Sequence, residues 1–333
     1  MRASCGERAR RTRSRRERDS AFLVVAFLLC SHVCVALCSH MCTASPTLLI
    51  DRYGDYLFVQ RGANVSPETR NKVLSTLPRS KGVYETVSSK DRSDGTQKPP
   101  RVIKGDASPE EGMFVAEHGV KYYVKLCETR LSTGLFLDQR DARAWMLNNS
   151  RGKEVLNLFA HGGGYSVAAA VGGAKRTVSV DMEKQWLDYQ GKSLEENGIG
   201  NKITEINGEK RMKHDVIFGD CFQWMKKLTG RGEQFDVVVL DPPSTSLGVK
   251  GKRWSAAKDY TALVSLAAPL VKEGGVLWTT TNSRKVLPEK FAEMVRKGLP
   301  EGSVLERVVP VAVDFPVKDG EAPGVKNLVW RLP

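Results

Sequence analysis

The chain has 333 residues, of which 41% are apolar and 27% are charged, a length suited to about two domains and a balance that excludes disordered and fibrous proteins. The formal net charge of +13 favours an anionic partner such as nucleic acid. Only Cys127 and Cys221 lie beyond residue 42, which excludes a disulfide framework or a four-cysteine zinc site there and indicates a reducing compartment. We expect no bound metal.

Residues 1–44 form a basic and then apolar leader that we exclude from the predicted fold. Eight Arg residues within positions 1–20 precede an apolar run over 21–38, and small residues follow near Ala44. This order resembles a secretory signal, the run is just long enough for a marginal membrane helix, and an Arg-rich leader fits organelle import. We expect an organelle location, mitochondrion or plastid. If the first methionine is misassigned, the alternative is a cytoplasmic protein, and we expect membrane contact only if the run is retained.

A small α+β domain is predicted over residues 45–130, and its sequence indicates no chemistry of its own. Ser66 can begin a helix because its hydroxyl accepts a hydrogen bond from a free backbone N–H of the first turn. The predicted elements are two strands within 47–59 that turn at Gly54 and Asp55, a helix from Ser66 toward Leu77, a mobile polar loop over 86–112, and a hairpin over 114–126 that turns at His118 and Gly119.

From residue 153 onward, short apolar runs alternate with stretches of helical periodicity. The predicted strands are 155–159, 177–181, 215–218, 235–240 and 276–280, and the predicted helices are 165–171, 183–196, 222–228, 256–271 and 289–299. Such alternation predicts right-handed crossovers and a parallel sheet covered on both faces. Two further strands, over 304–313 and 328–332, predict a terminal hairpin. The fold class is therefore α/β, with ligands expected outside the carboxyl ends of the strands.

A glycine loop, Gly162–Gly164, follows the first of these strands. It lets the backbone approach a ligand closely and leaves the next helix's N–H groups free, although three glycines can also simply make a tight turn. The loop lacks the spacing of a dinucleotide site, which disfavours NAD. The second strand ends at Asp181, where a carboxylate can accept hydrogen bonds from both ribose hydroxyls of a nucleoside cofactor. The alternative is an aspartate that caps the next helix.

Two more strands end in acidic residues. Asp220 follows the third strand and is placed to accept a hydrogen bond from an adenine amine. Asp241 follows the fourth strand, and Pro242 and Pro243 then fix the backbone in a rigid, extended turn. Three acidic strand ends in register, after a glycine loop, are difficult to explain as turns alone.

Several motifs recur together in one known family. They lie at 134–140 (GLFLDQR), 155–166, 178–182, 196–198, 220–224 and 240–244. With these motifs the chain resembles the S-adenosylmethionine-dependent ribosomal RNA methyltransferases that modify bases of large-subunit RNA. The resemblance implies a class I methyltransferase domain over residues 131–333, with a Rossmann-like sheet that ends in an antiparallel hairpin, behind the small α+β domain. It implies S-adenosyl-L-methionine as cofactor and large-subunit ribosomal RNA as substrate.

The resemblance also implies roles for individual residues. The implied cofactor-binding residues are Asn157, Phe159 and Gly162 on the methionine side, Asp181 with Met182 at the ribose, and Asp220 with Cys221 around the adenine. Asp241, Pro242 and Pro243 would form the methyl-transfer face. Gln139 and Arg140 would close over the cofactor or contact RNA phosphate, for which a guanidinium fork is suited.

One departure from the family pattern bears on the chemistry. The 5-methylcytosine branch needs a cysteine thiolate just after the fifth strand, because it must add to the pyrimidine ring. This sequence has Thr279–Lys285 (TTTNSRK) there, without a cysteine, and Cys127 and Cys221 lie elsewhere. The segment instead resembles the 7-methylguanine branch. Guanine N7 carries an in-plane lone pair, so positioning should suffice, and we expect Asn282 to contact the base edge.

Basic residues near the expected site indicate RNA contact. We expect phosphate contacts from Lys250, Lys252 and Arg253 after the Asp-Pro-Pro turn, and from Arg284 and Lys285 after the fifth strand. The alternative is that both groups are ordinary solvated loops. Trp254 and Tyr260 are candidates for stacking on a base or for packing in the core.

Two other function classes stay open. A non-catalytic RNA-binding relative would keep the sheet without turnover, although intact Asp181, Asp220 and Asp241 argue against it. A small-molecule methyltransferase is disfavoured by the basic loop and by the lack of a general base. The sequence does not indicate an oligomeric state.

Overall fold

The computed structural model describes residues 36–38, 48–87, 99–127, 132–200, 203–206, 209–247, 253–312, 314–315, 317 and 322–333. Most of the predicted leader, and also Lys250 and Lys252, lie outside these residues. The backbone of Ala36–Cys38 forms strand β1 and pairs with β2, so our exclusion of residues 1–44 from the fold is wrong for this short stretch. Within the described part, no helix has the length and apolar character needed to cross a membrane.

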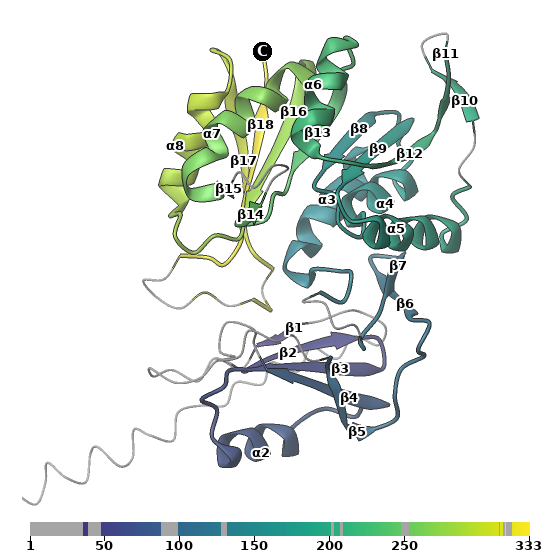
Figure 1. Ribbon diagram of the computed structural model, residues 1–333, viewed down its shortest axis with the longest axis vertical. Helices are drawn as coiled ribbons and strands as arrows, with labels where there is room; N and C mark the ends of the chain where they lie inside the picture. Colours follow the sequence, from purple (N-terminus) through teal and green to yellow (C-terminus); the bar gives the residue numbers. More distant parts are fainter. Residues whose placement is uncertain are drawn as a thin grey trace, which may run out of the picture.

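A front sheet, with strand order β1-β2-β3-β4-β5, lies at the bottom of Figure 1 above helix α2. Its elements are β2 (Leu48–Tyr53), β3 (Tyr56–Arg61), α2 (Pro67–Ser75), β4 (Gly82–Val87) and β5 (Arg101–Gly105). The predicted hairpin at Gly54 and the helix capped by Ser66 are confirmed, since the Ser66 hydroxyl accepts from the Thr69 N–H at 3.1 Å. The predicted mobile loop is wrong at Arg101–Gly105, which pairs with β4. Almost all of β5 is exposed, so it shows no apolar alternation in the sequence.

The predicted hairpin over 114–126 is confirmed as β6 (Met113–Glu117) and β7 (Val120–Val124). It packs on helix α5 and not in the front sheet, because the Tyr123 N–H donates to Ser193 Oγ at 2.9 Å. One apolar cluster joins the front sheet, this hairpin and the rest of the chain through Tyr53, Tyr84, Val124, Leu135, Val167 and Leu194. The predicted domain boundary near residue 130 stays a prediction.

A main sheet of seven strands has the order β12-β9-β8-β13-β16-β18-β17. Its strands are β8 (Glu154–Leu158), β9 (Arg176–Asp181), β12 (His214–Phe218), β13 (Phe235–Leu240), β16 (Val271–Thr281), β17 (Val304–Val309) and β18 (Lys326–Arg331). The strands from β12 to β16 run parallel, whereas β18 pairs antiparallel with both β16 and β17. This confirms the predicted parallel sheet with a terminal hairpin.

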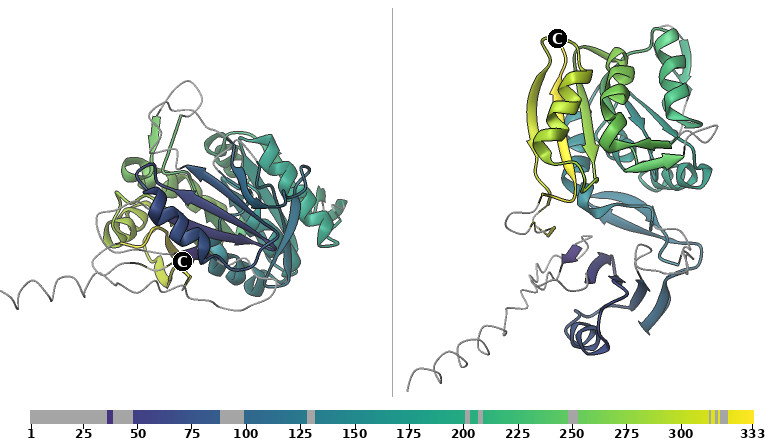
Figure 2. Two further views of the ribbon diagram at one scale, coloured as in Figure 1. Left: turned by 90° about the horizontal axis from the view of Figure 1, so that it is seen from below. Right: turned by 60° about the vertical axis from the view of Figure 1, so that its left-hand side comes forward.

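Helices cover both faces of the main sheet (Figures 1 and 2). Helices α6 (Cys221–Gly230), α7 (Ala256–Ala267) and α8 (Pro288–Gly298) pack on one face, and α3 (Arg140–Asn149) and α4 (Gly164–Val171) pack on the other, with α5 (Lys184–Glu196) beside α4. Alternate residues of β8 serve the two faces, since Leu156 and Leu158 contact the first group and Val155 the second.

Several element ends differ from the sequence prediction for local reasons. Helix α7 ends at Ala267 and a short 3₁₀ turn, Ala268–Leu270, follows, because Pro269 has no N–H to donate. Strand β17 ends at Val309, just before Pro310. The sequence reading also missed η2 (Leu137–Gln139), α3 and two small hairpins. These hairpins are β10 (Ile203–Ile206) with β11 (Glu209–Met212), and β14 (Thr245–Leu247) with β15 (Arg253–Ser255).

Candidate active site

The carboxyl ends of the parallel strands open into one cavity of about 680 Å³. Most of the predicted site residues line it, namely Gln139, Phe159, Gly162, Asp181, Met182, Asp220, Cys221, Asp241, Pro242, Pro243 and Asn282. They lie at or after the ends of β8, β9, β12, β13 and β16, or just before α3. We call residues 132–138, which lead from the hairpin to α3, the connector. A cavity of this size suits a small organic ligand or cofactor.

The glycine loop after β8 has an unusual backbone. Phe159 and His161 adopt positive φ angles of 62° and 50°, and Gly163 has a φ of 70°. A Cβ on Gly162 would lie 2.4 Å from the Gly134 carbonyl oxygen, and one on Gly163 would lie 2.2 Å from Gln190 Oε1. The glycines are therefore required by close packing against the connector and α5. The same packing brings the loop backbone to the cavity wall.

Asp181 ties the glycine loop to the second strand. Its carboxylate accepts hydrogen bonds from the His161 N–H at 2.8 Å and the Glu183 N–H at 2.9 Å. Burial raises the pKa of Asp181, while these backbone hydrogen bonds act to lower it. An ionised carboxylate can accept about four hydrogen bonds, so Asp181 keeps capacity for ligand hydroxyls while it orders the loop.

Asp220 and Cys221 follow strand β12 and begin helix α6. Asp220 caps this helix through a 2.9 Å hydrogen bond from the Gln223 N–H. The Cys221 thiol is buried, accepts from the Phe159 N–H at 3.2 Å and donates to the Val180 carbonyl at 3.4 Å. Burial raises the pKa of this thiol, which keeps it protonated and unreactive.

Asp241 and Asp138 place two carboxyl groups in the same part of the cavity. The Tyr165 hydroxyl donates to the Asp241 carboxylate at 3.3 Å. Burial and the nearby carboxyl of Asp138 raise the pKa of Asp241 to about 7, and burial raises the pKa of Asp138 to about 6. Two carboxyls that share one cavity favour a cationic ligand, because a positive charge between them would offset their repulsion.

Asn282 faces the Asp-Pro-Pro turn from the end of β16. The Ser244 hydroxyl donates to Asn282 Oδ1 at 2.6 Å, which orients the amide and leaves its Nδ2 group to donate to a ligand. Asn282 is exposed and lines the cavity. Trp254 lines the same cavity, whereas Tyr260 is fully buried and bonds to the Leu240 and Thr280 carbonyls. Of the two alternatives for Tyr260, packing in the core is therefore confirmed.

Three predicted cofactor contacts are engaged with other parts of the protein. The Gln139 side chain bridges β16 and β18 through hydrogen bonds to Thr280 and Asn327, both at 3.0 Å. Arg140 forms an ion pair with Asp314 and does not line the cavity. Asn157 is fully buried, donates to Ser166 Oγ at 3.0 Å and does not line the cavity, so its contact with the ligand stays a prediction.

The structure also assigns residues that sequence reasoning missed. Asp138 and Tyr165 line the cavity next to Asp241, and Trp186 packs on the His161 ring with a centroid distance of 4.1 Å. Burial lowers the pKa of His161 to about 4, so this histidine is neutral near pH 7 and serves in packing. Asp138 stands within the GLFLDQR motif and could have been proposed from that signal.

The predicted RNA contacts are only partly described. Lys250 and Lys252 lie outside the described residues, whereas Arg253, Arg284 and Lys285 are exposed. Arg284 and Lys285 come two and three residues after Asn282, which lines the cavity. These positions are compatible with phosphate contact, which stays a prediction.

A family model for S-adenosylmethionine-dependent methyltransferases matches residues 84–331. The chain belongs to this family. A ribosomal RNA large subunit methyltransferase I from Aeromonas salmonicida is 32% identical over 296 residues, which cover 86% of this chain and 71% of the relative. A protein of the same name from Escherichia coli is 32% identical over 257 residues, or 75% of this chain and 61% of the relative. The resemblance predicted from the motifs is confirmed.

Solved structures support the same fold. The methyltransferase SMU.776 complexed with SAH superposes with a TM-score of 0.76 at 24% identity, covering 97% of this chain and 80% of that one. A methyltransferase from Streptococcus mutans gives a TM-score of 0.74 at 23% identity, covering 100% and 83%. The main sheet is thus a class I, Rossmann-like methyltransferase sheet, as predicted.

S-adenosylmethionine is the cofactor of this family, and the cavity has the chemistry to hold it. Asp181 can accept hydrogen bonds from ribose hydroxyls, and Asp220 from an adenine amine. The pair Asp138 and Asp241 suits a sulfonium cation, since both carboxyls face the cavity beyond the glycine loop. Buried Cys221 forms part of the cavity wall.

We expect Asp241→Asn to stabilise the protein without ligand, increasingly as pH rises from about 4 to about 7. The folded protein holds the Asp241 proton up to a pKa of about 7, whereas the unfolded chain loses it near its ordinary value of 3.8. The free energy of unfolding of the variant, minus that of the wild type, should therefore increase by up to about 1.4 kcal/mol for each pH unit in this window. Above about pH 7 this difference should stay constant.

Urea unfolding of both proteins at several pH values measures this difference. The comparison with the wild type is needed because His161 and His214, whose pKa values are lowered to about 4, make the stability of both proteins rise with pH over part of this window. This contribution cancels in the difference between the two proteins. The groups around Asp241 that carry charge or titrate are Asp138, Arg143, Tyr165 and Tyr260. A difference that does not change with pH would contradict the assignment of this buried proton.

Proposed function

We propose that this protein methylates N7 of a guanine in large-subunit ribosomal RNA by direct transfer, without a covalent protein–RNA intermediate. The substrate class rests on the names of its relatives, which are large-subunit ribosomal RNA methyltransferases. The choice of atom rests on the end of strand β16. That strand ends in Thr279–Thr281, followed by Asn282, with no cysteine in the segment.

The absence of a nucleophile at this place is the observation that carries the proposal. Methylation of cytosine C5 needs a thiolate to add to the ring before the carbon can attack. Cys221 lines the cavity, but its thiol is buried and hydrogen-bonded on both sides. Cys127 lines neither described cavity. Guanine N7 attacks with its own lone pair, so it needs neither a thiolate nor a general base.

The remaining task of the protein is positioning and charge stabilisation. S-adenosylmethionine supplies the methyl group on a sulfonium, and N7-methylated guanine carries the positive charge after transfer. Asp241 and Asp138 face this charge at both stages and stabilise it electrostatically. Pro242 and Pro243 fix the wall beside the transferred methyl, and alignment of the two reactants supplies most of the rate.

Asn282 orients the base in this proposal. With its Oδ1 bonded to Ser244, the Nδ2 amide donates to guanine O6, which lies next to N7 on the same edge. Arg284, Lys285 and Arg253, together with Lys250 and Lys252, then bind the flanking phosphates. These contacts position the RNA but do not read its sequence.

We expect the double variant Cys127→Ser, Cys221→Ser to keep most of the methyltransferase activity of the wild type. A serine at 221 preserves the hydrogen bonds to Phe159 and Val180, so the cavity wall should stay in place. Transfer of labelled methyl groups to an unmodified transcript of large-subunit ribosomal RNA measures activity. A transcript made with 5-fluorocytidine provides the control, since it traps cysteine adducts of cytosine. A trapped protein–RNA adduct that disappears in either single cysteine variant would refute direct transfer.

A further inference from the structure

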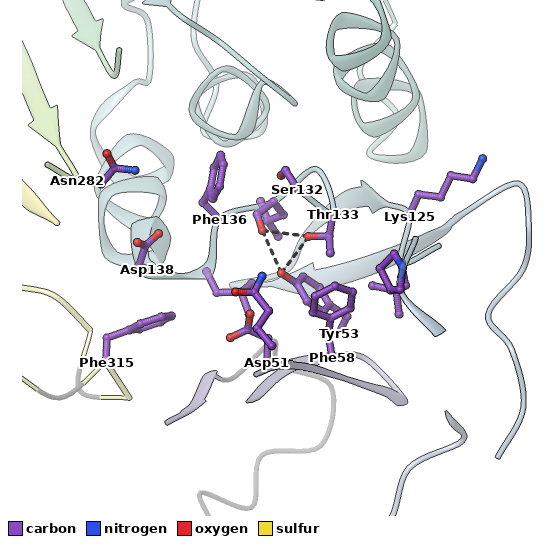
Figure 3. A pocket seen from close by; sticks show the side chains of 15 residues that line it. Asp51, Tyr53, Phe58, Lys125, Ser132, Thr133, Phe136, Asp138, Asn282 and Phe315 are labelled. Carbon is purple, nitrogen blue, oxygen red and sulfur yellow. Dashed lines mark hydrogen bonds between the residues drawn. The ribbon is translucent and has the colours of Figure 1, made fainter. Parts of the chain in front are cut away.

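A second cavity, of about 300 Å³, lies between the front sheet and the main sheet (Figure 3). Its residues come from β2 and β3, from the connector over 132–138, and from Pro100, Lys125, Leu126, Asn282 and Phe315. Leu135, Phe136, Asp138 and Asn282 line this cavity and the methyl-transfer cavity alike. The two cavities therefore adjoin across Asp138 and Asn282.

The walls of the second cavity combine aromatic rings with fixed polar groups. Phe58, Phe315 and Tyr53 provide apolar surface. The Tyr53 hydroxyl donates to the Leu135 carbonyl at 3.2 Å and accepts from Thr133 Oγ1 at 2.9 Å. These bonds hold β2 against the connector, so the cavity is preformed.

Asp51 of β2 and Asp138 of the connector present their carboxyls to the same space in Figure 3. Among the described residues, none donates a hydrogen bond to Asp51. Burial, with the charges of Asp138 and Asp314, raises the pKa of Asp51 to about 7. Asp51 is only partly exposed to solvent, and a carboxyl held largely away from water without a donor is costly for the protein alone. It is matched when a ligand brings N–H groups into the cavity.

The geometry of guanine supplies such donors at the required place. N7 and O6 lie on one edge of the purine, whereas N1–H and the N2 amine lie on the other side of the ring. A guanine whose N7 faces the methyl donor must therefore point N1–H and N2–H away from it. With N7 in the first cavity, that direction would lead toward the second cavity, which shares Asp138 and Asn282 with the first.

We propose that this cavity holds the Watson–Crick edge of the target guanine and that Asp51 selects guanine by accepting hydrogen bonds from N1–H and the N2 amine. A carboxylate accepts both bonds side by side, as it does from arginine. Adenine has an acceptor on this edge at N1, and cytosine has one at N3. Either acceptor would face the carboxylate oxygens and be repelled by them. Enzymes that modify bases commonly read a base turned out of its helix in this way.

This assignment rests on the proposed methylation of guanine N7, and it gives the front sheet a part in substrate selection. Asp51 is a specificity-determining residue that lies outside the methyl-transfer cavity. Its replacement should leave cofactor binding intact. Asp51→Asn should also fold, because it removes a carboxyl that burial makes unfavourable as an anion.

The test combines Asp51→Asn with a change in the RNA. Unmodified large-subunit ribosomal RNA transcripts are prepared with guanosine or with inosine, which keeps N7 and N1–H but lacks the N2 amine. Labelled methyl transfer gives kcat/KM for each pair, and calorimetry gives the S-adenosylmethionine affinity. Asp55→Asn, in the exposed β2–β3 turn, is the matched control. Inosine changes the folding of the RNA equally for the wild type and both variants, so this effect cancels when their inosine penalties are compared.

We expect the wild type and Asp55→Asn to prefer guanosine RNA by about 10-fold or more, the value of one well-placed base contact. In Asp51→Asn, activity on guanosine RNA should fall by a similar factor and the penalty for inosine should largely disappear, with cofactor affinity unchanged. Asp51→Ser should behave in the same way and guards against an effect peculiar to asparagine.

Two results would overturn the assignment. The first is a wild type that methylates both transcripts equally, which needs no variant to fold. The second is an inosine penalty of the same size in Asp51→Asn as in the wild type. A labelled product other than 7-methylguanosine would instead refute the proposed function itself, so the two failures are distinguishable.

Discussion

Replacing Asp181 with alanine is expected to lower the affinity for S-adenosylmethionine by at least about 100-fold. The carboxylate is placed to accept both ribose hydroxyls, and hydrogen bonds to charged groups contribute about 1.5–3 kcal/mol each. It also accepts from the His161 and Glu183 N–H groups, so its loss loosens the glycine loop. Calorimetric titration with S-adenosylmethionine measures the affinity, and circular dichroism confirms that the sheet is intact.

Asp188→Ala is the matched control for this prediction. Asp188 lies on the exposed side of helix α5, a few residues beyond Asp181, and its replacement should leave the affinity unchanged. If Asp181→Ala bound the cofactor as tightly as the control, the ribose contact would be wrong. The role of Asp181 would then be limited to the two backbone hydrogen bonds.

Replacing Arg143 with methionine is expected to lower the free energy of unfolding by about 3–5 kcal/mol. Arg143 joins α3 to the hairpin, because its Nε and Nη2 atoms donate to the Glu117 carboxylate at 2.7 and 2.6 Å. Its Nη1 donates to the Phe136 carbonyl at 2.7 Å. Arg143 and Glu117 are only 3% and 1% exposed, so methionine would leave the carboxylate buried and unpaired.

Urea unfolding measures this loss, and Arg70→Met provides the comparison. Arg70 pairs with Glu85 at 2.6 Å, but its side chain is 28% exposed, and pairs near the surface contribute about 0–1 kcal/mol. The buried pair should therefore cost several times more than the exposed one. Equal losses would show that Arg143 does not hold the connector. The double variant Glu117→Gln, Arg143→Met should recover part of the stability, since it removes the unpaired charge.

The sequence predicted the main sheet and its acidic strand ends because these depend on local patterns. Alternating apolar runs define the strands, and Asp181, Asp220 and Asp241 follow them directly. The roles of Gln139 and Arg140 could not be predicted, because their partners Asn327 and Asp314 are far away in the chain. The contact of Asn157 with Ser166 of α4 could not be predicted either, because a strand residue can face either side of the sheet.

The second cavity could not be predicted from the sequence either. Asp51 lies in a strand that shows only ordinary alternation, and nothing local indicates that its carboxyl meets Asp138 across two parts of the chain. Asp138 itself stood inside a recognised motif, but Tyr165 and Asp241 define its surroundings only in the folded protein. Packing between distant segments decides these positions, and a single sequence does not reveal it.

The central claim is direct methylation of guanine N7 in ribosomal RNA. The most direct test is to incubate the protein with unmodified large-subunit ribosomal RNA and S-adenosylmethionine, digest the RNA to nucleosides and identify the methylated product by mass spectrometry. Direct transfer predicts 7-methylguanosine at one main position, formed equally well by the double cysteine-to-serine variant. Formation of 5-methylcytidine, or of a methylated product only from small molecules, would contradict it.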